Sequence, residues 1–188
     1  RIAFYAPLKA PSHPVPSGDR QMARMLVRAL GMAGHQVEII SELRAFAAGS
    51  EPGVHDAVRA AAVHEIERIA AEWSRSGPPD LWFCYHPYHK APDFLADALA
   101  NRFDLPVVTV EASWSARRGI GAWVDSQAMV ADMVRSAAVN ICLREKDRAG
   151  LLMAVPDARC EMLLPFIDTT PFRAVAPDIA SRTMVTVA

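Results

Sequence analysis

The chain has 188 residues, of which 52% are hydrophobic and 22% charged, a composition typical of a globular domain and not of a disordered segment. Its formal net charge of −1 provides no basic footprint for nonspecific nucleic-acid binding. No stretch approaches the roughly twenty apolar residues of a membrane-spanning helix, and the start at Arg1 shows no signal-peptide pattern, so we expect a cytoplasmic protein.

A strand, a loop and a helix open the chain. Residues 2–6 form a short apolar run that ends at Pro7, which predicts a strand buried on both faces of a parallel sheet. After the loop, Ser17 is a suitable N-cap for a helix with Gly18 and Asp19 in its first turn. Apolar residues recurring at intervals of three and four predict one buried face, made of Met22, Met25, Leu26, Ala29, Leu30 and Ala33.

Gly34 ends this helix, and residues 37–40 read as a second strand, which completes a βαβ unit. Strands and helices continue to alternate. The pattern predicts further helices over residues 54–73, 91–103, 124–136 and 145–153, and further strands over residues 81–85, 107–110, 139–143 and 160–164. This alternation indicates an α/β fold, a Rossmann-like parallel β-sheet with helices on both faces.

Several residue types have no obvious partner in this pattern. His55 and His64 fall in the helix over residues 54–73, and we expect both at the surface. Cys84, Cys142 and Cys160 have no C-x-x-C spacing, which favours reduced thiols over a metal site.

We expect residues 1–168 to form one N-terminal domain. Residues 169–188 then read as a linker followed by the start of a truncated C-terminal domain, because the chain ends in a β-like run over residues 184–188. The alternative is that this run pairs with the edge of the same sheet.

Ligands of such sheets bind outside the carboxyl ends of the strands, so we expect a binding site in the loops that follow the strands. The helix that begins near Ser17 carries unpaired N–H donors and a partial positive charge, which suit a phosphate or carboxylate, and Gly18 lets the ligand approach. The alternative is that Ser17 and Asp19 only cap the helix. There is no G-x-G-x-x-G or P-loop sequence.

Two further strand ends carry reactive side chains. His86 follows the third strand and is our candidate catalytic residue, either as a general base or as a hydrogen-bond partner of a hydroxyl. Tyr88, His89 and Lys90 follow it and could hold sugar hydroxyls or a phosphate. The alternative is a structural histidine at a strand end beside a solvated lysine.

The fourth strand is followed by Glu111 and Ser113, which could hold hydroxyls of a substrate, although Glu111 could instead pair with Arg117 or Arg118. Trp114, Arg117 and Arg118 belong to an aromatic and basic loop that suits sugar rings, phosphates or a lipid surface. An ordinary surface loop is the alternative.

The opening of the chain resembles that of a family 4 type glycosyltransferase with the GT-B fold. The resemblance lies in the first strand, the proline-containing loop, the segment Pro16-Ser17-Gly18-Asp19-Arg20 and the helix end Ala33-Gly34-His35-Gln36-Val37. In that family the glycine of this loop approaches the donor diphosphate. The resemblance thus implies a donor-phosphate contact at Ser17, Gly18 and Arg20.

If the resemblance holds, the chain is the acceptor-side domain of a retaining hexosyltransferase that needs neither a metal nor a cofactor other than its nucleotide-sugar donor. Its partners would be that donor, a glycan or lipid-linked acceptor, and a C-terminal domain without which the chain turns over little; peripheral contact with the inner membrane surface fits a lipid-linked acceptor. The rival hypothesis is a single Rossmann-like binding module for an anionic or nucleotide ligand.

Overall fold

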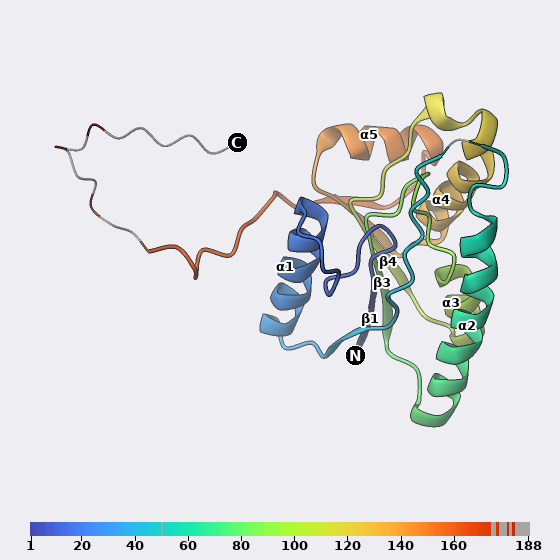
Figure 1. The fold of residues 1–188 in the computed structure, drawn as a ribbon, viewed down its shortest axis with the longest axis horizontal. Coiled ribbons are helices and arrows are strands. Elements are labelled where there is room, and N and C mark those ends of the chain that lie inside the picture. The colour runs from blue at the N-terminus through green and yellow to red at the C-terminus, as the bar shows by residue number, and fades with distance from the viewer. Residues whose placement is uncertain (50, 174–175, 177–179, 181, 183–188) are drawn as a thin grey trace.

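The computed structural model describes residues 1–49, 51–173, 176, 180 and 182. It confirms the predicted α/β fold, a parallel sheet flanked by helices and consistent with a Rossmann-like arrangement (Figure 1). The strands are β1 (Ile2–Tyr5), β2 (Val37–Ile39), β3 (Leu81–Tyr85), β4 (Val107–Val110), β5 (Val139–Cys142) and β6 (Cys160–Met162). They lie in the order β2-β1-β3-β4-β5-β6, and every neighbouring pair is parallel.

The helices divide between the two faces of the sheet. They are α1 (Gly18–Met32), α2 (Asp56–Ser76), α3 (Ala96–Phe103), α4 (Val124–Ser136) and α5 (Glu145–Ala154), with two short 3-10 turns, η1 (Ala116–Arg118) and η2 (Gly121–Trp123). Helix α1 lies on one side of the strands, whereas α2, α3 and α4 lie on the other (Figure 1). Helix α5 packs against α4 and the β5–β6 edge. The chain therefore leaves the neighbouring strands β1 and β3 toward opposite faces of the sheet, through α1 and α3.

The inner strands β1, β3 and β4 are almost entirely apolar because both of their faces are buried, whereas the edge strands β2 and β6 are partly exposed and carry Glu38 and Glu161. Tyr5 and Trp82 face the layer of α2 and α3, and Trp73 of α2 packs edge-on against Trp82 with ring centroids 6.3 Å apart. Phe4 and Phe83 face α1 and stack at 5.5 Å. Burial on both faces of the sheet thus explains the apolar runs of these inner strands, as predicted.

The predicted buried face of α1 is partly wrong. Ala23 and Leu26 are its buried residues, whereas Ala29 and Ala33 are exposed. Helix α1 is apolar on a second side because the segment after β6 runs along it. Met25 and Ala29 line a cavity of about 390 Å³ against that segment, and Arg28 forms an ion pair with its Asp168.

Helix α3 starts at Ala96, five residues later than predicted. The cause is the buried carboxylate of Asp93, whose Oδ1 accepts hydrogen bonds from the backbone N–H groups of Leu95 (2.8 Å) and Ala96 (2.9 Å). Its Oδ2 accepts from Trp82 Nε1 at 2.9 Å. These three hydrogen bonds make Asp93 a structural anchor between β3 and α3, and burial raises the pKa of its carboxyl group.

The thiols of Cys84, Cys142 and Cys160 are free, as expected, and the first two are buried. The segment after β6 is extended and contributes Phe166 to the core on the α1 side. The apolar run over residues 184–188, from which a second domain was expected, lies outside the described residues.

Candidate functional site

The candidate site lies at the carboxyl ends of β1 and β3. Helix α1 leaves β1 toward one face of the sheet, and α3 leaves β3 toward the other, so the loops after these strands separate. A hydrogen bond joins the two loop regions, because His86 Nδ1 lies 3.1 Å from Asp19 Oδ1. The two stretches singled out in the sequence, 67 residues apart, therefore meet at this point.

The first turn of α1 is organised by its cap. Ser17 Oγ accepts a hydrogen bond from the backbone N–H of Arg20 at 3.2 Å, as the cap prediction requires. Gly18 is exposed, and apart from its chain neighbours and its own helix backbone no atom lies within 4 Å of the position that a Cβ there would occupy, so the helix surface at Gly18 is open. The Arg20 guanidinium instead donates to the carbonyl of His13 at 2.9 Å, which fixes the preceding loop. Of the three predicted phosphate contacts, Gly18 has the most open surroundings.

The hydrogen bond from His86 lowers the pKa of Asp19 below its ordinary value. The Asp19 carboxylate is therefore a stable acceptor at neutral pH, which assigns the proton of the His86 ring to Nδ1. In the neutral ring, His86 Nε2 then carries a lone pair that can accept a hydrogen bond from a hydroxyl group. The ring is stacked on Tyr88, with centroids 5.1 Å apart, so both its tautomer and its orientation are held.

Two adjacent strands end in residues with left-handed backbone conformations. His86 has a φ of 60° and donates its N–H to the carbonyl of Val110 at 2.8 Å. Glu111 has a φ of 55° and donates its N–H to the carbonyl of Ile141 at 2.9 Å. Residues other than glycine rarely adopt this conformation, and they do so mostly where the surrounding structure imposes it. The chain therefore turns away from the sheet directly after β3 and directly after β4, at the same edge of the sheet.

The carboxylate of Glu111 has two partners. Its Oε2 accepts a hydrogen bond from the Tyr85 hydroxyl at 3.1 Å, and its Oε1 lies 3.8 Å from Nη2 of Arg144. The alternative partners expected from the sequence, Arg117 and Arg118, form no ion pair with it. Arg144 was not predicted, although it lies two residues after the end of β5, where the rule for strand ends applies as well. Arg144 also pairs with Asp147 at 2.8 Å, which fixes its guanidinium at the start of α5.

His55 is buried, not exposed as predicted, whereas His64 is exposed. The reason is that His55 lies at the start of α2, where its Nε2 donates to the carbonyl of Lys90 at 3.1 Å. That carbonyl also accepts from the N–H of Ala47 at 2.8 Å. The loop after β3 is therefore held from two sides.

His89 and Trp123 form the second part of the site. The rings pack edge to face with centroids 5.2 Å apart, and the Lys90 ammonium lies 5.9 Å from the Trp123 centroid. Burial, together with the charges of Arg118 and Lys90, lowers the pKa of His89 to about 4. His89 is thus neutral at physiological pH.

The remaining predicted residues of the loop after β4 differ in their surroundings. Ser113 donates its backbone N–H to the carbonyl of Pro87 at 3.1 Å, which joins this loop to the one after β3. Trp114 is half-buried and packs against the cluster that includes Leu151 of α5. Arg117 and Arg118 are exposed.

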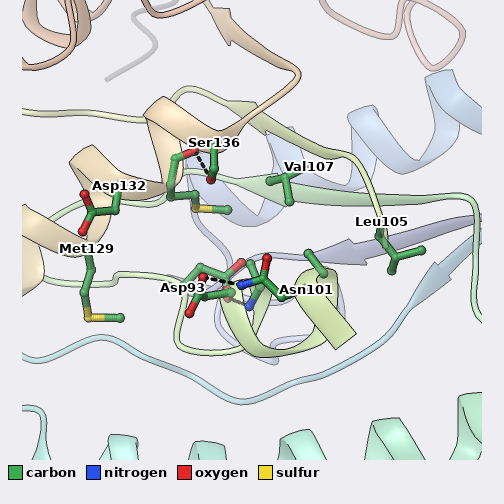
Figure 2. Close-up of a pocket in the computed structure, with 11 residues that line it drawn as sticks. Asp93, Asn101, Leu105, Val107, Met129, Asp132 and Ser136 are labelled. Atoms are coloured by element: carbon green, nitrogen blue, oxygen red, sulfur yellow. Dashed lines mark hydrogen bonds between the residues drawn. The ribbon is translucent and has the colours of Figure 1, made fainter. Parts of the chain in front are cut away.

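A separate cavity of about 460 Å³ lies between α3 and α4, on the face of the sheet that α2, α3 and α4 cover (Figure 2). None of the predicted site residues lines it. Its rim carries Asp97, which accepts from Asn101 at 2.9 Å, and Asp132, which pairs with Arg135. Asp97 and Asp132 are therefore engaged with neighbours on their own helices, and Asp93, which also lines the cavity, accepts from Trp82.

Within the described part of the chain, no group of three or more His, Cys, Asp or Glu side chains is arranged to hold a metal ion. No helix there has the length and apolarity needed to cross a membrane. A comparison with models of known protein families found no match, and a comparison with curated proteins found no similar sequence. The resemblance to glycosyltransferases therefore stays a prediction.

Proposed function

We propose that this chain is the acceptor-side domain of a GT-B glycosyltransferase, which transfers a sugar from a nucleotide-sugar donor to a hydroxyl group with retention of configuration and without a metal ion. The observation that carries the proposal is the Asp19–His86 hydrogen bond of 3.1 Å at the divergence of β1 and β3. It joins the helix start that the resemblance relates to donor phosphates with the loop that carries the candidate catalytic histidine.

In this proposal, His86 accepts a hydrogen bond from the acceptor hydroxyl through Nε2. The Asp19 carboxylate holds the proton on Nδ1, and it stabilises positive charge on the ring when Nε2 takes a proton. Tyr88 limits the rotation of the ring by stacking on it. The three side chains together provide a base that is already oriented before the substrate binds.

The first turn of α1 binds the anionic part of the donor. Its open surroundings at Gly18 permit close approach, and its backbone N–H groups and helix dipole favour negative charge. The Asp19 carboxylate would repel an anion in direct contact. Its hydrogen bond to His86 holds the carboxylate toward β3. In this proposal Gly18 therefore faces the anion, and Asp19 orients His86.

Glu111 and Arg144 form the far wall of the site. Glu111 retains one hydrogen bond from Tyr85 and a longer contact with Arg144, and a carboxylate can accept further hydrogen bonds from sugar hydroxyls. We assign acceptor binding to Glu111 and orientation of its carboxylate to Tyr85 and Arg144.

The proposal is tested with His86→Asn, because Asn tolerates the left-handed backbone of this position better than other side chains. The matched control is His64→Asn on the exposed side of α2. Release of UDP or GDP from a panel of nucleotide sugars is measured in the protein that contains this chain. We expect a fall of about 100-fold or more in turnover for His86→Asn and none for His64→Asn. Turnover that survives His86→Asn in a folded protein would refute the role of His86.

The rival function is a binding module for an anionic or nucleotide ligand. The open first turn of α1 at Gly18 favours it, since such a site needs no second domain. A thermal-shift titration of the 188-residue chain with UDP, GDP and their sugars separates the two proposals. A shift in the isolated chain as large as that in a longer protein would favour the module, whereas a shift that needs the longer protein would favour the transferase.

A further inference from the structure

A cluster of basic groups surrounds Trp123, next to the site described above. We infer that Lys90 and Arg118, with His89 beside them, form a subsite for a dianionic phosphate group. In the terms of the proposed function, on which this last step rests, the acceptor of the sugar carries a phosphate.

The charge of this cluster is not balanced within the described residues. The ion pairs among the described residues involve other cations, and neither Lys90 nor Arg118 takes part in one of them. The charged groups that act on His89 are Arg118, Lys90 and the imidazole of His55, and the ring of Tyr88 packs edge-on against it with centroids 5.2 Å apart. A chain with a net charge of −1 thus concentrates positive charge on one loop pair. Such a concentration favours an anion.

The two cations stand on different supports. The Lys90 carbonyl is held by His55 Nε2 (3.1 Å) and by the Ala47 N–H (2.8 Å), and Trp123 is buried beneath the Lys90 ammonium. Arg118 belongs to an exposed 3-10 turn, and Gly121 just beyond it has a φ of 66°. An ammonium on a well-anchored backbone and an exposed guanidinium suit a phosphate, which a guanidinium binds with two parallel hydrogen bonds.

His89 contributes an unsatisfied polar atom. Its Nε2 is enclosed and has no hydrogen-bond partner among the described residues. A buried nitrogen without a partner is destabilising, and a ligand oxygen or a water molecule that reaches it removes that penalty. The pKa of His89 is low because burial and the neighbouring cations disfavour the imidazolium. The same cations, Arg118 and Lys90, form the proposed phosphate site.

The test measures binding of inorganic phosphate to the 188-residue chain by isothermal titration calorimetry. Arg118→Gln removes one cation of the cluster, and Arg75→Gln is the matched control, because Arg75 is exposed near the end of α2 and forms no ion pair. We expect Arg118→Gln to weaken phosphate binding about tenfold and Arg75→Gln to leave it unchanged. Absence of phosphate binding by the wild-type chain, or equal losses in both variants, would overturn the assignment, whether or not the protein transfers sugar.

A second readout follows the His89 ring by NMR with sulfate, whose charge is constant in the range of the titration. Bound sulfate places negative charge near Arg118 and Lys90, so it should raise the His89 pKa from about 4 by about one unit, and affinity should increase as the pH falls. An unchanged His89 titration at saturating sulfate would refute the position of the site.

Vesicles of phosphatidylcholine with and without phosphatidic acid identify the source of the phosphate. Cosedimentation that requires phosphatidic acid and is lost in Arg118→Gln would identify a lipid headgroup. Phosphate binding without cosedimentation would identify a soluble phosphorylated acceptor.

Discussion

The hydrogen bond between Asp19 and His86 predicts a stability effect whose size follows from the structure. Asp19→Ala removes a carboxylate that lies in the first turn of α1 and accepts from His86 at 3.1 Å. A carboxylate at this position contributes about 0.3–1 kcal/mol through the helix dipole. The Asp19 side chain is 35% exposed, so its interaction with His86 is screened and adds about 0.5 kcal/mol. We expect the free energy of unfolding to fall by about 1 kcal/mol at neutral pH.

The two contributions are separated by a control and a double-mutant cycle. Asp125 lies in the first turn of α4 and forms no ion pair, so Asp125→Ala reports the helix-dipole contribution alone. Combining Asp19→Ala with His86→Asn reports the interaction energy of the pair, expected at about 0.5 kcal/mol. Urea denaturation followed by tryptophan fluorescence gives all of these values, since Trp73 and Trp82 are buried in the core.

The pH dependence has a definite sign. The hydrogen bond from His86 lowers the pKa of Asp19 in the folded state, so the carboxylate contributes stability that is fully present above its unfolded pKa of about 3.9. That stability is lost as the pH falls through the lower folded pKa. The difference between the wild-type chain and Asp19→Ala should therefore shrink toward acid pH. A difference that is equal at neutral and strongly acid pH, or no larger than that of Asp125→Ala, would refute the reasoning.

Two further predictions concern positions outside the proposed catalytic residues. His55→Ala should lower the free energy of unfolding by about 2–3 kcal/mol, because it leaves a cavity between Phe94 and Trp123 and removes the hydrogen bond to the Lys90 carbonyl. The control His64→Ala, on the same helix, should change it by less than about 0.5 kcal/mol. Equal effects of the two substitutions in urea denaturation would contradict the structure. Asp104→Gly should stabilise the protein by about 0.5–1 kcal/mol, since Asp104 ends α3 with a φ of 52°, and a loss of thermal stability would contradict that explanation.

The sheet could be predicted from the sequence because its strands are short apolar runs bounded by proline, glycine and polar residues. Burial on both faces makes such runs continuous, and the alternation with helices then fixes a parallel arrangement. The helix over residues 124–136 was predicted with its observed bounds. The buried face of α1 was not, because its apolar residues serve two surfaces, the sheet and the segment that contains Phe166.

The site could be predicted only as an edge of the sheet. The rule for parallel strands placed His86 and Glu111 at the same end, but the pairing of His86 with Asp19 depends on how two loops fold over a distance of 67 residues. His55 shows the same limit, because a carbonyl 35 residues away determines its burial. Arg144 is a different case. It lies near the carboxyl end of β5, where the rule for parallel strands applies, so the sequence was sufficient to predict it.

The backbone of the site supports a functional role for His86 and Glu111 that side-chain chemistry alone does not. Asp104, His86 and Glu111 are the described residues other than glycine with positive φ. At Asp104 the conformation is the ordinary end of a helix and the side chain is exposed. At His86 and Glu111 it occurs at the ends of two adjacent strands, where glycine would avoid a cost of about 1 kcal/mol each. Each residue instead carries a titratable group that is held by another charged side chain. Replacement by glycine would relieve the strain and lose that group, so increased stability together with lost ligand binding would identify these positions as functional.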